Sequence, residues 1–205
     1  MEIQIRQATP EDAPQAAPLL AATMDEYGVM TLGLGDPQRQ LKVLAAWFQQ
    51  PGNRFSYERT WLAEAEGEIA GLLLTLGGKE LPASENALAN GIFELYNPIE
   101  LLRMLWRLSV LGRTNEATAE EYVLAHLAVN EKFRRMGIAS QLMEKAEANA
   151  REEGYHKICL EVEIGNIPAE SLYQKMGYSR TFTTEFTRHA RVLHCPGYHH
   201  MVKEI

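Results

Sequence analysis

The chain has 205 residues, 46% of them hydrophobic, and a formal net charge of −7. A chain of this length and composition can bury a substantial core and form one domain. Its acidic balance argues against general nucleic-acid binding and is compatible with substrates that carry an amine. No stretch approaches the roughly 20 apolar residues that span a bilayer, so we expect no membrane partner.

Targeting and redox features of the sequence predict a cytoplasmic protein. The N-terminal segment MEIQIRQATPED lacks the basic and then apolar pattern of a secretory signal. The two cysteines, Cys159 and Cys195, do not form a disulfide framework, which indicates a reducing compartment.

The first part of the chain alternates between strand and helix patterns. Residues 2–7 alternate in polarity and predict a strand, and Thr9 is a suitable N-cap for a following helix. Pro14 and Pro18 remove hydrogen bonds inside that helix, so it should be kinked or delayed. The glycine-rich residues 28–35 predict a loop that lacks any phosphate-binding spacing.

The next segments predict a helix over 37–50 and a β-hairpin. The hairpin joins 56–65 to 68–76, and its second strand is nearly all apolar, as in a strand buried on both faces. Residues 77–119 are the least regular part of the chain, and we interpret them as a helical insertion into a single domain over residues 1–205.

Within this insertion, residues 99–111 (IELLRMLWRLSVL) predict a helix with one narrow polar stripe. Such a helix cannot lie free on the surface, so it should pack on the core, cap a substrate site or meet a second subunit. We expect Trp106 to be buried against a lid surface or a partner subunit. The second option predicts a homodimer.

A strand, a basic loop and a helix follow one another in the middle of the chain. Residues 121–129 predict the strand and 137–153 predict the helix. The first N–H groups of a helix have no partner within it, and the helix dipole favours negative charge there. With Lys132, Arg134 and Arg135 nearby, the loop predicts an anion site. The alternative is that its glycine only eases the turn and the basic side chains are solvated.

The last part predicts a strand over 156–163, a short helix over 168–176 and two closing strands over 178–186 and 198–205, joined through Pro196 and Gly197. Strands and helices alternate, with hairpins at both ends. This order predicts an α/β fold in which a mixed, mostly antiparallel sheet of about seven strands is flanked by helices.

Three motifs lie in this order between residues 121 and 178. They are Arg134-Arg135-Met136-Gly137-Ile138-Ala139, then Leu160-Glu161-Val162 followed by Asn166, then Ala169-Glu170-Ser171-Leu172-Tyr173-Gln174-Lys175-Met176-Gly177-Tyr178. Together they resemble the motifs of the GNAT superfamily, the acyl-coenzyme A-dependent N-acetyltransferases. Asn130-Glu131 departs from the Asp-Pro common there. The resemblance implies the acyl-CoA N-acyltransferase fold, with the sheet splayed beside Val129.

The resemblance also implies acetyl-coenzyme A as co-substrate and no metal. Backbone N–H groups of the loop would hold the pyrophosphate, and the strand before it would pair with the pantetheine arm. Asn166 would hydrogen-bond the same arm, although it can instead cap the following helix. The implied cofactor-binding residues are Leu127, Ala128, Val129, Arg134, Arg135, Met136, Gly137, Ile138, Ala139, Ser140 and Asn166.

Tyr173 and Glu161 are the predicted catalytic residues. Tyr173 matches the tyrosine that protonates the leaving sulfur in similar enzymes, although it can instead be an aromatic packed on the sheet. Glu161 is the first candidate for the general base, with an ion-paired or solvated carboxylate as the alternative. Glu121 and Glu163 are further candidates, and a water chain without a dedicated base is another option. Strand parity places His126 on the opposite face from Glu121, as a packed structural histidine.

The sequence contains a second group of possible ligands, His194, Cys195, His199 and His200. Zinc ligands can have such short spacings, but a Pro-Gly turn and paired strands would keep these side chains from converging, so we predict no metal site. Cys159 should be an inert core thiol.

The sequence therefore predicts transfer of an acetyl group from acetyl-coenzyme A to a primary amine, by direct attack in a ternary complex. The acceptor should lie against residues 20–60 and 77–119. Candidates are a protein or peptide N-terminus, a lysine, a polyamine or an aminoglycoside-like amine. The alternative is a non-catalytic acyl-coenzyme A-binding sensor, which would keep the loop but would not need Glu161 or Tyr173.

Overall fold

The computed structural model describes residues 2–111, 116–186 and 196–205. In this part of the chain seven strands form one sheet in the order β1-β2-β3-β4-β5-β7-β6. The β4–β5 pair is parallel and the other pairs are antiparallel. The strands are β1 (Ile3–Gln7), β2 (Thr60–Ala65), β3 (Glu68–Gly77), β4 (Glu121–Val129), β5 (Lys157–Glu163), β6 (Ser179–Glu185) and β7 (Gly197–Glu204).

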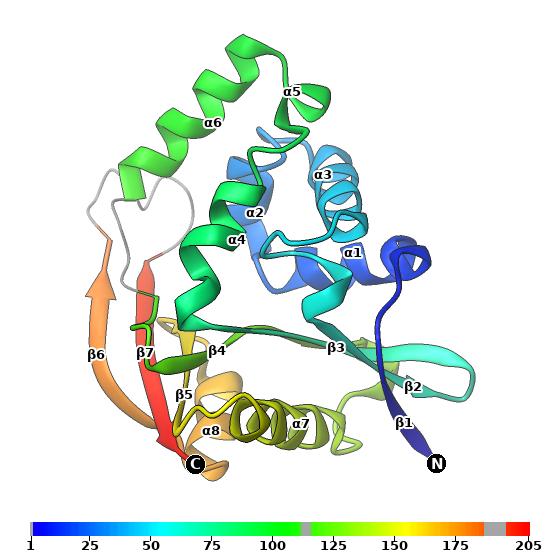
Figure 1. Ribbon diagram of the computed structural model, residues 1–205, viewed down its shortest axis with the longest axis vertical. Helices are drawn as coiled ribbons and strands as arrows, with labels where there is room; N and C mark the ends of the chain where they lie inside the picture. Colours follow the sequence, from blue (N-terminus) through cyan, green and yellow to red (C-terminus); the bar gives the residue numbers. More distant parts are fainter. Residues whose placement is uncertain (1, 112–115, 187–195) are drawn as a thin grey trace.

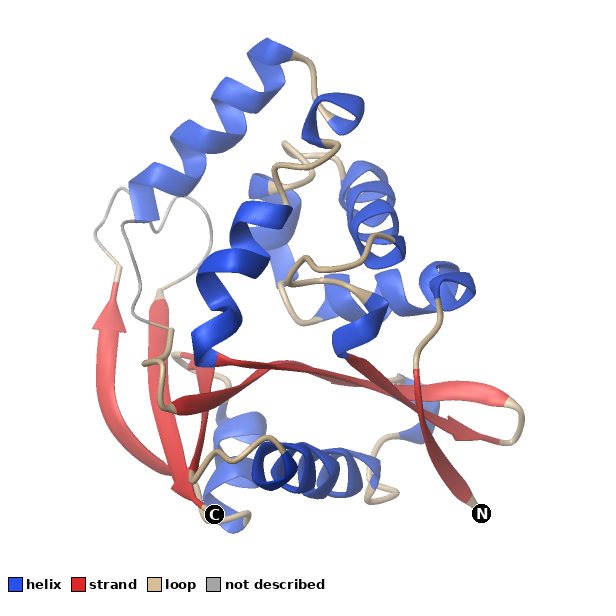
Figure 2. Ribbon diagram, viewed as in Figure 1, coloured by secondary structure: helices blue, strands red, loops and turns tan. Residues whose placement is uncertain are grey.

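Helices cover both faces of the sheet (Figures 1 and 2). The first six helices lie on one face, and the last two lie on the other. The predicted α/β fold with a mixed, mostly antiparallel sheet flanked by helices is therefore confirmed. The helices are α1 (Ala13–Ala22), α2 (Asp25–Thr31), α3 (Pro37–Gln49), α4 (Leu81–Ala87), α5 (Ile92–Leu95), α6 (Pro98–Leu111), α7 (Ile138–Glu152) and α8 (Ile167–Lys175). No described helix is both long and apolar enough to cross a membrane.

The central strand β3 contributes to a separate hydrophobic core on each face. Leu72 and Leu74 pack with Leu20 under the first group of helices, whereas Leu73 packs with Leu142 of α7. All five side chains are completely buried. Burying a leucine stabilises the fold by about 2 kcal/mol. The nearly all-apolar sequence of this strand therefore reflects burial on both sides, as predicted.

Strands β4 and β5 pair over only part of their length. The register joins 121–123 to 157–159. Beyond these pairs the two strands separate, while β5 stays paired with β7 along all its residues from 157 to 163. The sheet is therefore split between the second half of β4 and the end of β5, beside Val129 as predicted.

A β-bulge in β4 changes which side chains face which core. Leu74 pairs with His126 and Thr75 pairs with Leu124, so Ala125 has no counterpart in β3. An extra residue of this kind reverses the alternation of the side chains that follow it. His126 therefore lies on the same face as Glu121. The parity argument that placed it on the opposite face was wrong because the sequence pattern does not show the bulge.

Two other sequence-based boundaries differ from the structure. Residues 28–31, predicted as loop, belong to α2. Gly28 lies inside this helix. A Cβ at this position would overlap the side chain of Gln40 from α3, so the glycine allows close packing of α2 on α3 rather than a turn. The strand predicted from residue 56 begins only at Thr60, after a 3₁₀ turn over Tyr57–Arg59.

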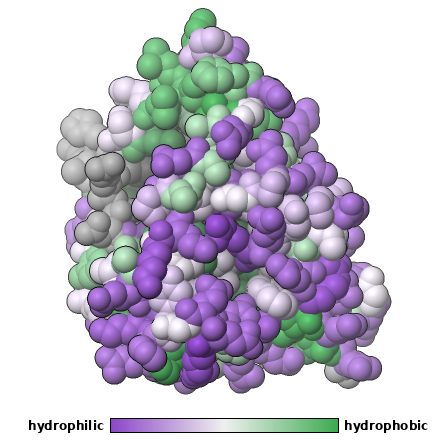
Figure 3. Space-filling model, viewed as in Figure 1, coloured by the Kyte–Doolittle hydropathy of each residue, from purple (hydrophilic) through white to green (hydrophobic). Residues whose placement is uncertain are grey.

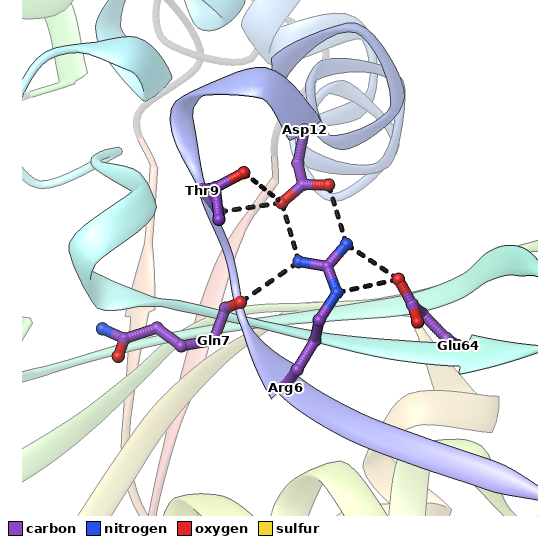
Figure 4. Close-up of polar contacts among 5 residues, drawn as sticks. All are labelled: Arg6, Gln7, Thr9, Asp12 and Glu64. Carbon is purple, nitrogen blue, oxygen red and sulfur yellow. Dashed lines mark hydrogen bonds and ion pairs between the residues drawn. The ribbon is translucent and has the colours of Figure 1, made fainter.

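The start of the helical layer is fastened to the sheet by Arg6 (Figure 4). Its guanidinium donates to both carboxylate oxygens of Asp12 at 2.8 Å and to Glu64 of β2 at 2.8 Å. The Thr9 N–H also donates to Asp12, at 2.8 Å. The Arg6 hydrogen bond is the main reason that the pKa of Asp12 falls to about 2. After this turn α1 starts at Ala13, with Pro14 in its first turn, as the predicted delay requires.

Candidate active site

The loop between β4 and α7 is held by buried side chains and exposes its backbone. Phe133 and Ile138 are buried on either side of it. Between them Arg135 and Gly137 adopt left-handed conformations, with φ of +66° and +80°. A left-handed residue at Gly137 directs the chain into α7 at little conformational cost.

The N-terminus of α7 lacks a side-chain cap, as far as the described residues show. The described starts of α1, α2, α4 and α5 also lack one, whereas Asp36 caps α3 and Asn166 caps α8. The N–H groups in the first turn of α7 therefore have no side-chain acceptor, and the anion site at this turn stays a prediction. The predicted backbone donors Met136, Ile138, Ala139 and Ser140 lie in or next to this turn.

The three basic side chains of the loop differ in their surroundings. Lys132 donates to Glu68 at 2.7 Å and lies over the Phe133 ring, so it is directed to the β2–β3 turn. Arg134 is exposed and pairs with Glu131 at 3.3 Å. Arg134 and Arg135 can therefore reorient toward a bound anion at little cost, since exposed ion pairs are weak.

The open edge of β4 lies next to this loop. Leu127, Ala128 and Val129 pair with Leu73, Leu72 and Gly71 of β3 on one side. On the other side the split leaves them without a partner from β5. This edge can accept an extended ligand as an additional strand.

Asn166 is the N-cap of α8 and Tyr173 lies within this helix, which follows β5. The side-chain carbonyl of Asn166 accepts from the Ala169 N–H at 3.3 Å, which is the capping role that the sequence left open. Its amide nitrogen can still donate to a ligand. Tyr173 is buried beside Tyr178, with ring centroids 6.1 Å apart. Burial raises the pKa of Tyr173 to about 12, so its hydroxyl keeps its proton at neutral pH.

A cavity of about 540 Å³ lies on the face covered by the first six helices. Leu124, Ala125 and His126 of β4 line it on one side of the split, and Glu161 of β5 lines it on the other. Tyr173 is not among its lining residues. The structure therefore places the two predicted catalytic residues on different sides of the sheet, with the split between them.

Glu161 is a carboxylate in the cavity wall whose pKa lies near neutrality. Burial and the nearby charge of Glu116 raise its pKa to about 7, against the opposing effect of Arg54. Within the described part of the chain, no hydrogen bond or ion pair holds its carboxylate. A carboxylate with this pKa can accept a proton near neutral pH.

The other candidate bases are less suitably placed. Glu121 accepts from the N–H and the hydroxyl of Thr118, at 2.7 and 2.8 Å, which is a structural role. Neither Glu121 nor Glu163 lines the cavity.

A partly buried ion pair in the cavity wall has no counterpart in the sequence patterns. Arg54 donates to both carboxylate oxygens of Glu116 at 2.8 and 3.0 Å, and it also pairs with Glu85 at 3.2 Å. Arg54 and Glu116 are 62 positions apart and belong to no motif, so their contact exists only in the folded chain.

His126 is a neutral hydrogen-bonding group in the same cavity. Burial and the charge of Arg54 lower its pKa to about 3. Its Nδ1 lies 2.7 Å from the Thr23 hydroxyl, which donates its own proton to the Leu20 carbonyl. Nδ1 must therefore carry the histidine proton, and Nε2 carries the lone pair. The imidazole also stacks on Phe55 at 5.5 Å.

The histidines proposed as possible metal ligands face different neighbours. Nδ1 of His199 contacts Thr183 at 2.8 Å, and that of His200 contacts Thr181 at 2.7 Å. His194 and Cys195 lie outside the described residues. Another group, Glu121, Cys159 and His200, brings its ligand atoms within 4.8 Å of one another. Burial raises the pKa of Cys159 and keeps it a thiol, as predicted for a core cysteine.

Comparison with known proteins agrees with this geometry. The model of the acetyltransferase (GNAT) family matches residues 34–178. Human N-acetyltransferase 8 is 36% identical over 70 residues, which are 34% of this chain and 31% of that protein. The chain thus matches less than half the length of this curated relative.

Two solved structures extend the comparison to the whole chain. A crystal structure described as an acetyltransferase has a TM-score of 0.75 and 26% identity, covering 98% of this chain and 99% of the other. The PaiA N-acetyltransferase of Thermoplasma acidophilum, solved in complex with coenzyme A, has a TM-score of 0.56 and 14% identity, with both chains covered completely.

Proposed function

The chain belongs to the GNAT acetyltransferase family, and from that premise we propose that it moves an acetyl group from acetyl-coenzyme A to a primary amine. The observation that carries this proposal is the split between β4 and β5. It has an uncapped helix N-terminus at one end and opens to a cavity that contains Glu161.

The residues at the split suit the donor substrate. A pyrophosphate fits the backbone N–H groups at 135–140, because they combine unused donors with the positive end of the α7 dipole. The edge of β4 at 127–129 suits the amide groups of a pantetheine arm, with Asn166 as a further donor. The coenzyme A complex of the Thermoplasma relative supports this choice of ligand.

The side chains then have distinct chemical roles. Glu161 takes the proton that the acceptor ammonium must lose before its nitrogen can attack the thioester carbonyl. A backbone N–H on the β4 edge stabilises the oxyanion that forms when the C–N bond is made. Tyr173 gives its proton to the sulfur as the C–S bond breaks, and the second proton that the nitrogen loses returns to the tyrosinate, so Glu161 holds the one proton released overall. The products are an N-acetylated amine and coenzyme A in its thiol form.

No nucleophilic motif in the sequence suggests a covalent acetyl-enzyme, so we propose direct attack in a ternary complex. Initial-rate kinetics with both substrates varied should therefore give intersecting reciprocal plots. Parallel plots would contradict direct attack, because they indicate a covalent intermediate.

A thiol-release assay tests the function itself. The purified chain should release coenzyme A from acetyl-coenzyme A only when an amine is present. If calorimetry shows acetyl-coenzyme A binding but no amine stimulates thiol release, the chain is a sensor rather than an acetyltransferase.

A further inference from the structure

We propose that the acceptor is a small monoamine with an apolar, arylalkyl or alkyl body, rather than a polyamine, an aminoglycoside or a peptide. This inference rests on the proposed acetyl transfer and names the class of its acceptor. It rests on the observation that charged groups and apolar side chains line different parts of the cavity.

The charged groups that line the cavity in the described residues form one cluster together with His126. Arg54 is bonded to Glu116 and Glu85, and it is close enough to affect the ionisation of His126 and Glu161. With Glu161 ionised, these groups have a net charge of −2, since three carboxylates face one guanidinium and the histidine is neutral. The cluster therefore favours one ammonium group at the split.

His126 adds a hydrogen-bond acceptor beside the charged cluster. Because its Nδ1–H is used by Thr23, the lone pair of Nε2 is the group it can offer to a ligand. An ammonium has three N–H donors, and Glu161 and His126 Nε2 can accept two of them. The bulge in β4 is what brings this histidine to the cavity face.

The rest of the described cavity wall is mostly apolar. Apart from Thr23 and Thr31, whose hydroxyls donate to backbone carbonyls, and Tyr27 and Tyr198, its residues are hydrophobic, namely Met24, Leu32, Trp47, Phe55, Leu88, Ala89, Ile92, Met104, Leu105 and Leu108. A second ammonium or a row of hydroxyl groups placed against these residues would lose hydrogen bonds to water without replacement. Polyamines, aminoglycosides and peptide backbones carry such groups, whereas a phenyl or alkyl chain does not.

The apolar wall that excludes these polar acceptors is held in place by contacts between the helices. Arg39 of α3 donates to both carboxylate oxygens of Glu100 in α6, at 2.6 and 2.7 Å. Arg107 of α6 also donates to the Met30 carbonyl in α2, and the Tyr96 hydroxyl donates to the Leu32 carbonyl at 2.6 Å. A volume of about 540 Å³ is within the range of sites that enclose a small molecule.

Helix α6 thus lines the proposed acceptor cavity, and the predicted option that it caps a substrate site stays a prediction. Met104 is buried and lines the cavity, but Trp106 is 66% exposed. The option that Trp106 is buried against a lid surface of the same chain was therefore wrong, because it lies on the outer side of the helix, whereas its burial against a partner subunit stays a prediction. Apolar side chains gather over α5 and α6 in Figure 3, where Phe93, Ile99 and Leu102 are also exposed.

The acceptor class is tested with the full chain, acetyl-coenzyme A and a panel of amines. We expect kcat/KM for phenethylamine and hexylamine to exceed that for spermidine, kanamycin and a peptide N-terminus by 100-fold or more. A preference of tenfold or more for any of the last three would overturn the inference and leave acetyl transfer intact. No thiol release with any amine would overturn the proposed function as well.

Two matched variants of α6 locate the effect. Leu108→Asp places a charge in the apolar wall and should lower kcat/KM for phenethylamine at least tenfold. Leu102→Asp makes the same change on the same helix at a side chain that is 69% exposed and does not line the cavity, so it should leave the value unchanged. Equal effects would contradict the proposed acceptor site. Thermal unfolding of both variants, with calorimetric titration of phenethylamine, separates a folding defect from lost binding.

Discussion

The proposed donor side of the split consists of consecutive backbone from Leu127 to Ser140, whereas the acceptor side consists of side chains from segments far apart in the sequence. The donor side uses N–H groups and a left-handed glycine, which any similar local sequence can provide. The acceptor side combines Arg54, Glu116, His126 and Glu161 with apolar helices. The difference explains why a short motif can predict the donor but not the acceptor.

The largest expected effect is a loss of acetyl-coenzyme A binding on the donor side, caused by substitution of Gly137. Gly137→Asp puts a strained, negatively charged residue at the α7 N-terminus, so acetyl-coenzyme A binding should weaken by about 100-fold or more. Calorimetric titration with acetyl-coenzyme A measures this change in affinity. Gly154→Asp is the control, because Gly154 has a similar φ of +79° and equally open surroundings but lies beyond the end of α7. If the control weakened binding equally, the anion site would be wrongly placed.

Next in size is the loss of the base on the acceptor side. Glu161→Gln should lower kcat by about 100-fold and leave acetyl-coenzyme A affinity unchanged. Because the carboxylate must be deprotonated to accept a proton, wild-type activity should rise with pH through about 7. This rise of activity with pH should disappear in the Glu161→Gln variant. A Glu121→Gln variant with the larger loss would instead identify Glu121 as the base.

A smaller effect is expected at Tyr173, on the other side of the sheet. Tyr173→Phe removes the hydroxyl but keeps the packing against Tyr178, so kcat should fall by roughly tenfold with little change in donor affinity. Single-turnover thiol release measures the step directly. Tyr178→Phe is the matched control, since its hydroxyl is buried and has no described partner. Full activity of Tyr173→Phe would leave the tyrosine as a packing residue only.

The smallest effect on the rate of acetyl transfer is expected from a change at the contact between Arg6 and Asp12, which should act on stability instead. Asp12→Asn weakens the Arg6 contact and should lower the free energy of unfolding by about 2 kcal/mol at pH 7. Because the pKa of Asp12 is depressed in the fold, this stability is present above about pH 4 and is lost as the pH falls toward 2. Urea unfolding of both proteins at several pH values should show the difference shrinking over that range. A constant difference would contradict the assignment to ionisation.

The predictions that succeeded depend on short-range patterns. The alternation of strand and helix signals gave the sheet and its flanking helices, and the spacing from Val129 to Tyr178 gave the family and the position of the split. Asn166 shows the limit of such patterns, because the same asparagine fits a cap and a ligand contact, and the fold uses its carbonyl for the cap.

The predictions that failed depend on packing between distant elements. His126 changed face because one residue of β4 bulges opposite β3. Residues 28–31 became helix because Gly28 lets α2 pack closely on Gln40. The lid option for Trp106 failed because the other side of α6 lines the cavity and leaves Trp106 exposed within this chain.

The sequence alone therefore determined the sheet, the loop proposed as the anion site and the proposed candidates Glu161 and Tyr173, because period, glycine position and motif spacing are local properties of the chain. The tertiary structure alone decided the ion pair of Arg54 with Glu116, the face of His126 and the apolar wall of the cavity. These depend on contacts between residues tens of positions apart, and no local pattern encodes which side chains will meet.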